Sequence, residues 1–496
     1  MENATAHRFL IVVAAALAAC GDGASSDVPE DTVVLLDTVG DSGPADTFVE
    51  GTDTDRPMDA VEDTSSGAGP ALLLLGQTGI GEASAAAVDD FVIDLRTGDT
   101  FGVGGFALRG DLQPAVYLSL DGVALEPESF EVGEQQVTLD YRVVTGGRYV
   151  IDVQPHQGQG AGRFLVRTWC TGGPCADDPV ALPDVTLRLL AINDLHGNLA
   201  PRDDDSGGVA WLASHAKALR AEVEHSVFVS AGDLVGGSPY LSGRFHDEPT
   251  VEAMNVAGLD INGVGNHEFD EGPDELKRLA TGGCHPIDGC QDGTPFEGAA
   301  FEMLAANVND ATGATLFPPF AVRVYGGVPV GFIGLTLEGT PAVTLASQVE
   351  SLEFNDEIGT VNALLPRLQA MGVETIVLVL HEGGTQSGGA NDCDNFSGGA
   401  RWIAQGLSDV VDILVTGHTH RTYNCWLGDK LVTSAGASGR WLTKIDMTLN
   451  ATTRDVWVDD ARNRFIDHGL APDPEVAALV ARYEALVAPE LAAVVG

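Results

Sequence analysis

Five short motifs rich in aspartate, asparagine and histidine are spread along this chain. They occupy residues 193–197, 232–233, 265–268, 381 and 417–420. Carboxylate and amide oxygens and imidazole nitrogens are the side-chain atoms with which proteins bind divalent metal ions. One such motif alone would be a weak signal. Five in this order, most of them directly after apolar runs that are typical of strands, predict a metal centre.

The motifs contain two aspartates, one asparagine and four histidines that can act as metal ligands. These candidate ligands are Asp194, His196, Asp233, Asn266, His381, His418 and His420. Asp194 and His196 are two positions apart, and His418 and His420 repeat that spacing, so each pair can converge on one cation from a turn. If the Asp233 carboxylate bridges two metal ions, these seven side chains are sufficient to bind both.

Two metal ions at this spacing of ligands would favour hydrolysis of a phosphate ester. Ions roughly 3.5–4 Å apart polarise a phosphoryl oxygen and lower the pKa of a bridging water, and the resulting hydroxide attacks phosphorus in line with the leaving oxygen. His267, beside Asn266, is placed to protonate that leaving oxygen. Asp270, three residues further on, can hold the imidazole in one tautomer. His267 and Asp270 are therefore the predicted catalytic pair.

The elements that must position these residues alternate between apolar, strand-like runs and helical stretches from about residue 185 to 459. An alternation of this kind predicts a layered α/β fold, in which chemistry gathers at the carboxyl ends of the strands. The predicted strands are 187–192, 227–230, 328–335, 375–380 and 413–416, and the predicted helices are 214–224, 358–371 and 472–495.

Upstream of this region the pattern changes to short alternating runs separated by turn residues. Residues 90–95, 115–120, 148–153 and 163–167 are such runs, and their spacing predicts an antiparallel β-sandwich. Together with the glycines that precede two of them, these runs resemble the small pre-peptidase C-terminal modules of secreted bacterial hydrolases. The resemblance implies either binding of sugars or surfaces or a passive spacer.

The N-terminus has the features of an export signal. Arg8 precedes an apolar run from Phe9 to Ala19, too short to span a bilayer, and Cys20 follows. The segment resembles a bacterial lipobox, which implies lipidation of Cys20; the alternative is a secretory signal cut near Ala19. The acidic stretch 21–69 is poor in aromatic residues and predicts a disordered tether, with specific calcium binding as the alternative.

Charge and cysteine usage agree with an extracytoplasmic protein. The formal net charge is −46, which argues against binding to nucleic-acid duplexes. Beyond Cys20, six cysteines remain, an even number that fits an oxidising compartment. Local pairs Cys170–Cys175 and Cys284–Cys290 would leave Cys393–Cys425, although six cysteines allow fifteen pairings. A zinc–cysteine cluster is an alternative that the spacings do not favour.

The region 185–495 resembles the calcineurin-like metallophosphoesterases, and specifically their bacterial 5'-nucleotidase group, through residues 193–197, 232–239, 265–270, 381–384 and 417–420. The resemblance implies a four-layer α/β/β/α sandwich and two zinc, manganese or cobalt ions. One ion would be held by Asp194, His196, Asp233 and His420, and the other by Asp233, Asn266, His381 and His418. His267 and Asp270 would be catalytic. The remaining histidines, including His246 and His285, are predicted to be structural or on the surface.

The predicted organisation has five segments. They are a lipoprotein signal peptide (1–20), the tether (21–69), the β-sandwich (70–176), the metallophosphoesterase domain (184–467) and a helix (468–496) leading toward a further domain. Members of this group continue into a C-terminal domain that stacks the nucleobase. Because the sequence stops at Gly496, the expectation is that this platform is missing and that affinity for nucleotides is reduced.

Three functions remain open at the level of sequence. The first is a lipid-anchored, extracytoplasmic phosphoesterase that acts on nucleoside monophosphates or related small phosphate esters, in the manner of a 5'-nucleotidase. The second is a 2',3'-cyclic-nucleotide phosphodiesterase, because the same metal core supports both reactions. The third is an inactive surface-display or binding lipoprotein, against which the intact ligand set argues.

Overall fold

The computed structural model describes residues 70–133, 135–158, 160–201 and 206–494. The predicted signal peptide with Cys20 and the predicted tether 21–69 lie outside the described residues.

The predicted β-rich region consists of two five-stranded sheets. One has the order β1 (Ala71–Leu73), β3 (Asp90–Leu95), β9 (Gly147–Pro155), β5 (Pro114–Leu120) and β6 (Val123–Ala124). The other has the order β2 (Thr78–Ala83), β10 (Gly162–Gly172), β4 (Thr100–Ala107), β8 (Gln136–Arg142) and β7 (Ser129–Val132). A 3₁₀ turn, η1 (His156–Gly158), follows β9, and a short helix, α1 (Pro174–Asp177), follows β10.

The alternation in this region buries one face of the central strands between the two sheets. Phe91 and Ile93 of β3 are buried with Phe101 of β4 and Phe164 of β10 in one apolar cluster. One pairing departs from the antiparallel prediction, since β1 runs parallel to β3, with Ala71 opposite Phe91. The two strands can run in the same direction because β2, which lies between them in the chain, belongs to the other sheet.

Two six-stranded mixed sheets follow. The first has the order β14 (Glu302–Leu304), β13 (Ile261–Gly263), β12 (Ser226–Ser230), β11 (Val185–Ile192), β25 (Trp441–Leu449) and β26 (Val456–Phe465). The second has the order β16 (Phe320–Tyr325), β17 (Val328–Thr336), β19 (Thr375–His381), β22 (Ile413–Thr416), β24 (Lys430–Ala435) and β23 (Thr422–Leu427). In each sheet four neighbouring strands are parallel. Two small ribbons pair β15 (Val308–Asn309) with β18 (Glu353–Phe354) and β20 (Gly384–Thr385) with β21 (Ser397–Gly398).

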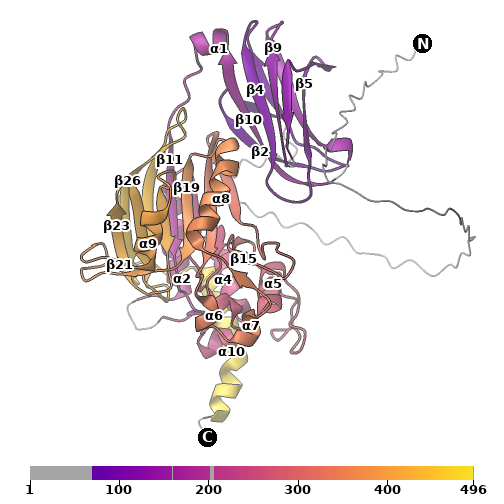
Figure 1. Ribbon diagram of the computed structural model, residues 1–496. Coiled ribbons are helices and arrows are strands. Elements are labelled where there is room, and N and C mark those ends of the chain that lie inside the picture. The colour runs from indigo at the N-terminus through magenta and orange to yellow at the C-terminus, as the bar shows by residue number, and fades with distance from the viewer. Residues whose placement is uncertain (1–69, 134, 159, 202–205, 495–496) are drawn as a thin grey trace, which may run out of the picture. The chain divides into compact units, whose positions relative to one another are not determined.

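Helices cover these sheets (Figure 1). The longer ones are α2 (Val209–Arg220), α4 (Glu248–Ala257), α5 (Pro273–Thr281), α8 (Glu357–Ala370), α9 (Gly399–Gly406) and α10 (Pro474–Val494). The single turns are α3 (Tyr240–Gly243), α6 (Thr340–Val343), α7 (Ala346–Val349) and the 3₁₀ turn η2 (His267–Phe269). Among the helices of the described residues, none is both long enough and apolar enough to cross a bilayer.

Successive side chains of the central strands point to opposite layers, which produces the predicted four-layer α/β/β/α sandwich. In β11, Leu189 packs between the two sheets, whereas Leu190 packs against the helical layer that contains α2 and α4. In β19, Val379 packs between the sheets and Leu378 packs against α8 and α9. The central parts of both strands therefore have no solvent-exposed face, and this explains the apolar runs 189–192 in β11 and 376–380 in β19.

Helix boundaries differ most from the prediction at α2, and those of α8 and α10 differ by one or two residues. The helix expected at 214–224 is α2, which begins at Val209 and ends at Arg220. Its N-cap is Gly208, which offers no side-chain hydrogen bond, so the sequence lacks the usual polar start signal. The last helix, α10, begins at Pro474, two residues after the predicted start at 472, and the Asp473 carboxylate accepts hydrogen bonds from its first turn.

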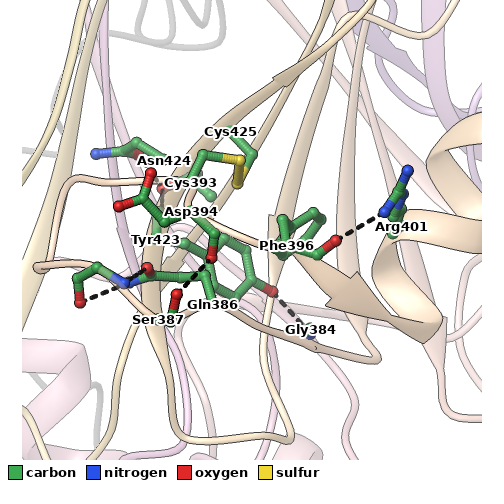
Figure 2. The surroundings of a disulfide bond; sticks show 12 residues. Gly384, Gln386, Ser387, Cys393, Asp394, Phe396, Arg401, Tyr423, Asn424 and Cys425 are labelled. Carbon is green, nitrogen blue, oxygen red and sulfur yellow. Dashed lines mark hydrogen bonds between the residues drawn. A yellow bond between two sulfur atoms is a disulfide. The ribbon is translucent and has the colours of Figure 1, made fainter.

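The three disulfides are Cys170–Cys175, Cys284–Cys290 and Cys393–Cys425, which confirms the preferred pairing. Figure 2 shows Cys393–Cys425, which fastens the loop between β20 and β21 to β23. In the same region the Gly384 N–H donates to the Tyr423 hydroxyl at 3.1 Å. The loop that follows His381 is thus tied to the strand that follows the last metal motif.

We predict that replacing both Cys393 and Cys425 by serine lowers the free energy of unfolding by about 2–4 kcal/mol, because the bond closes a loop of 32 residues. The matched control replaces Cys284 and Cys290, whose separation is only 6 residues. Loop-closure entropy makes the first pair more costly than the control by about 1.5 kcal/mol. Urea unfolding followed by tryptophan fluorescence measures both values, and equal losses would contradict the prediction.

Candidate metal centre

The structure brings all five motifs to the carboxyl ends of parallel strands. In the first sheet they follow β11, β12 and β13, and in the second sheet they lie at the end of β19 and directly after β22. Because the two sheets pack face to face through one apolar layer, the two sets of strand ends meet at a single edge of the sandwich. The polar side chains predicted as ligands therefore come from both sheets.

One group of donors consists of Asp194, His196 and His420. Nε2 of His420 lies 3.2 Å from the Asp194 carboxylate and 3.0 Å from Nε2 of His196. Two imidazole nitrogens and a carboxylate oxygen thus face one point. Asp194 is fully buried, whereas the His420 side chain is half exposed, so one side of the group is open to solvent.

The other group consists of Asp233, His381 and His418, with the amide oxygen of Asn266 among them. Nε2 of His381 lies 3.0 Å from the Asp233 carboxylate and 3.1 Å from Oδ1 of Asn266. Nδ1 of His418 lies 3.0 Å from the same amide oxygen. The Asp233 carboxylate also lies 3.7 Å from Nε2 of His196, so it stands between the two groups.

These donors fit two divalent metal ions. Ligand atoms about 2.1 Å from one ion are separated by about 3.0–3.4 Å at octahedral to tetrahedral angles, which matches the spacings above. Nδ1 of His196 contacts the carbonyl of Gly236 at 2.9 Å, and Nδ1 of His381 contacts the carbonyl of Ala231 at 2.7 Å. A carbonyl only accepts, so both Nδ1 atoms carry a proton, and Nε2 is the ring nitrogen that each histidine can present to an ion once that nitrogen is deprotonated.

The electrostatics of the centre favour added positive charge. Burial alone would lower the pKa of His381, but Asp233 and the neighbouring carboxylates outweigh it and raise that pKa to about 10. Burial would likewise raise the pKa of Asp233, but His381 and His196 hold it below its ordinary value. The side chains are therefore arranged so that a cation between them is stabilised.

Five of the seven candidate ligands have a left-handed backbone conformation. These are Asp194 (φ 50°), His196 (φ 47°), Asp233 (φ 50°), His418 (φ 67°) and His420 (φ 56°). Non-glycine residues adopt this conformation uncommonly and at a cost of about 1–3 kcal/mol each. Such a concentration of strained residues is typical of functional sites, where the surrounding packing holds side chains in a required direction.

Close approach of the backbone explains one of the motif glycines. Gly232 has φ 81°, and a Cβ atom there would lie 2.7 Å from Nδ1 of His381 and 2.6 Å from the Gly265 nitrogen. A side chain at position 232 would therefore displace a ligand and the turn that carries Asn266.

Glu268, to which the sequence assigned no role, holds two of the ligand loops together. Its carboxylate accepts hydrogen bonds from the backbone N–H groups of Asp233 (2.9 Å), Leu234 (3.0 Å) and Gly265 (2.7 Å). Burial and the charge of Asp233 raise the pKa of Glu268 to about 7. Its place directly after His267 in the motif was the only sequence signal.

We predict that Glu268→Gln lowers the free energy of unfolding by about 1–3 kcal/mol, since one buried backbone donor then faces an amide N–H. The same change weakens metal binding, because the Gly232–Asp233 turn loses its anchor. Urea unfolding and metal content after dialysis measure the two effects. Glu353→Gln on β18, where the side chain is exposed, is the control. A Glu268→Gln protein indistinguishable from this control would disprove the anchoring role.

Asn193, also without a predicted role, orients the first ligand. Its Nδ2 donates to the Asp194 carboxylate and to the carbonyl of Gly436, each at 2.6 Å. Its Oδ1 accepts from the N–H of Ala435 at 2.7 Å. The loop after β24 thereby fixes the direction of the Asp194 carboxylate.

The predicted catalytic pair lies beside the two donor groups. Nδ1 of His267 is 2.8 Å from Oδ2 of Asp270, and the two rings of His267 and His196 meet edge to face at 5.0 Å. The hydrogen bond to Asp270 raises the pKa of His267 above its ordinary value, against an opposing effect of burial. Both side chains are partly exposed, so a substrate can reach them.

All seven candidate ligands and the pair His267–Asp270 therefore meet at one place. A model of the calcineurin-like phosphoesterases matches residues 187–422, which contain every one of these residues. The chain belongs to this family. Its members bind divalent metals, and the four-layer fold predicted from the resemblance agrees with the sheets described above.

Three relatives illustrate the match. "Endonuclease YhcR" of Bacillus subtilis is 32% identical over 63% of this chain and 26% of its own length. "Uncharacterized protein in pqq-V 5'region" of Acinetobacter calcoaceticus is 43% identical over 31% of this chain and 89% of its own length. "Probable 5'-nucleotidase" of Treponema pallidum is 31% identical over 48% of this chain and 37% of its own length. The chain thus spans less than half of the endonuclease and of the nucleotidase.

Proposed function

We propose that this phosphoesterase uses a dinuclear metal centre to hydrolyse nucleoside monophosphates or related small phosphate esters, in the manner of a 5'-nucleotidase. The observation that carries the proposal is the convergence of two donor groups, with the Asp233 carboxylate of one group 3.7 Å from His196 of the other. A single-ion site would not need a carboxylate between two sets of ligands. His267 and Asp270 beside that carboxylate complete a centre with a proton donor.

Each ion has its own set of ligands in this proposal. Asp194, His196, Asp233 and His420 hold one, and Asp233, Asn266, His381 and His418 hold the other. Zinc, manganese and cobalt all suit such nitrogen and oxygen donors. When bound, the ions supply Lewis-acid polarisation of the phosphoryl group and activation of a water molecule.

The protein's own contribution is position and proton transfer. The backbone N–H of His267 donates a hydrogen bond to the Asp233 carboxylate at 2.9 Å. This bond fixes the imidazole next to the proposed bridging ligand. The Asp270 carboxylate accepts from Nδ1 of His267, so the proton on Nε2 is directed away from Asp270 and toward a bound ester. A protonated His267 can then give that proton to the leaving oxygen.

The charge of the chain and its relatives support a small substrate. A net charge of −46 repels a polyanion, whereas a single phosphate can be neutralised locally at the metal centre. Similarity to the relative named as a probable 5'-nucleotidase supports a nucleotide as the substrate. Because the chain matches only 37% of that relative, selection of the base is a separate question from hydrolysis.

A 2',3'-cyclic-nucleotide phosphodiesterase is the second candidate. The relative named as an endonuclease matches more of this chain than the nucleotidase does, and an endonuclease cleaves phosphodiesters. The same donor groups can serve a diester, because attack at phosphorus requires the same in-line geometry.

The protein's location follows in part from its cysteines. Three disulfides indicate an oxidising, extracytoplasmic compartment. Attachment to the cell envelope through lipidated Cys20 is a further proposal, and mass spectrometry of the N-terminal peptide tests it.

The experiment that tests the function is phosphate release by the purified chain loaded with manganese, cobalt or zinc. The substrates are AMP, 2',3'-cyclic AMP and p-nitrophenyl phosphate. We expect metal-dependent turnover that Asp233→Asn abolishes and that His215→Gln, on α2 outside both donor groups, leaves unchanged. The ratio of the AMP and cyclic AMP rates separates the two candidates. A folded, metal-loaded protein without turnover on any ester would favour the binding-protein alternative.

We predict a pH dependence set by His267. As a proton donor it must be protonated, so kcat falls as the pH rises through its pKa, which the Asp270 hydrogen bond places above the ordinary value. Asp270→Asn removes that effect and shifts the alkaline limb of the kcat profile to lower pH. His267→Asn lowers kcat by about 10²–10⁴-fold and abolishes the alkaline limb. An unchanged alkaline limb in Asp270→Asn would exclude the assigned role of the pair.

A further inference from the structure

A second cluster of histidines and carboxylates lies outside the metal centre. Its members are His246, between α3 and α4, Glu271, Glu275 in the first turn of α5, and His285. Each offers a nitrogen or oxygen atom, and these atoms lie within 4.8 Å of one another. None of the four is a ligand of the centre described above.

We propose that His246, Glu271, Glu275 and His285 form an additional binding site for a divalent transition-metal ion, with Zn²⁺ as the ion that the donors fit best. Two imidazoles and two carboxylates are a ligand set that zinc takes in four-coordinate sites. The spacing of up to 4.8 Å has to contract to the roughly 3.3 Å expected between tetrahedral ligands, which small side-chain movements can supply.

Asp288 supplies the outer support that metal-binding histidines normally have. Nδ1 of His246 faces Glu271 at 2.7 Å, and its Nε2 lies 3.0 Å from the Asp288 carboxylate. With the ion on the Glu271 side, Asp288 accepts a hydrogen bond from the other ring nitrogen. This carboxylate–histidine–metal arrangement fixes the ring and increases its basicity as a ligand.

The carboxylates in and around this cluster outnumber the cationic side chains that face them, which favours binding of a cation. Arg278 is bound to Glu275 and to Glu248, so this one guanidinium already serves two carboxylates. Glu271 pairs with the imidazole of His246, and Asp288 lies close to the imidazoles of both His246 and His285. A divalent ion would neutralise the excess of negative charge, and burial of the Glu275 and His285 side chains would strengthen that attraction.

The covalent structure preorganises part of the site. The disulfide Cys284–Cys290 closes the loop that carries His285 and Asp288, and α5 carries Glu275. Restricting that loop reduces the entropy lost on binding an ion. Glu271 and Asp288 are about half exposed, so the ion has a path of entry from solvent.

One ring has to turn for both imidazoles to bind the same ion. The rings of His246 and His285 are stacked, with centroids 3.7 Å apart and planes 11° from parallel, so their lone pairs do not converge. We assign the movement to His285, because its carboxylate contacts are the longer ones. Its ring lies 3.6 Å from Asp288 and 4.0 Å from Glu275 and accepts one hydrogen bond, from the Asp288 N–H at 3.1 Å. The His246 ring lies 2.7 Å from Glu271 and 3.0 Å from Asp288. Rotation about the Cβ–Cγ bond of histidine meets a broad, shallow energy profile.

The test measures zinc bound per chain after saturation with Zn²⁺ and exhaustive dialysis. Asp233→Asn combined with His196→Gln and His381→Gln removes ligands from both donor groups of the main centre. In this background we expect one zinc per chain, and we expect none after adding His246→Gln and His285→Gln. Adding His215→Gln instead, a matched histidine outside both clusters, keeps the ion. Zinc X-ray absorption of the background protein should show two imidazole ligands.

Other results would overturn the proposal. They are a folded background protein that retains no zinc, or equal zinc with and without His246 and His285. A third is a zinc spectrum without imidazole, which would leave the cluster as a proton-binding ion-pair network. If the histidine variants misfold by circular dichroism, Asp288→Asn replaces them, because its half-exposed side chain can change without disturbing the core. That change should weaken zinc binding by about 10–100-fold, and an unchanged affinity would equally refute the site.

Discussion

The buried carboxylate of Asp233 must be balanced by positive charge, and the surrounding structure is arranged to provide it. Asp233 is 1% exposed and lies beside the equally buried Glu268. Two neighbouring carboxylates in a low-dielectric interior are costly unless cations or hydrogen-bond donors face them. Glu268 accepts hydrogen bonds from the backbone N–H groups of two loops that carry candidate ligands, and the histidines are left to face Asp233. This separation leaves the Asp233 carboxylate available for the proposed metal ions while its neighbour Glu268 fixes the loops.

The packing energy of the sandwich offsets the conformational cost of the strained loops. The central strands are buried on both faces, and their parallel order places successive loops at one edge. Against this rigid support, five ligands hold a left-handed backbone that a flexible loop would not maintain. Backbone carbonyls of Gly236 and Ala231 then select the tautomers of His196 and His381. The centre is therefore preorganised by the fold, and the proposed proton donor His267 is attached to it through the Asp233 carboxylate.

The acidic side chains of the protein have different effects on the surface and in the two histidine-containing clusters. Across the surface it disfavours polyanionic partners, whereas in two clusters it is paired with histidines in geometries that suit cations. The cluster of His246, Glu271, Glu275 and His285 shows that histidines judged singly from the sequence do not reveal which carboxylates they face. His246 and His285 were expected to be structural or on the surface, because each is isolated in sequence. Only the loop closed by Cys284–Cys290 and the first turn of α5 bring them to common carboxylates.

The sequence by itself determined the family, the alternation of strands and helices, the preferred disulfide pairing and the candidate ligands that the structure brings together, since residue types, spacing and hydrophobic periodicity are local properties. It did not determine the start of α2, where Gly208 gives no capping signal, or the parallel pairing of β1 with β3. Nor did it show the left-handed ligand loops or the anchoring by Glu268 and Asn193. Those features depend on contacts between residues far apart in the chain. Tertiary structure decided them because only packing of the two sheets sets the distances and burial on which their energies depend.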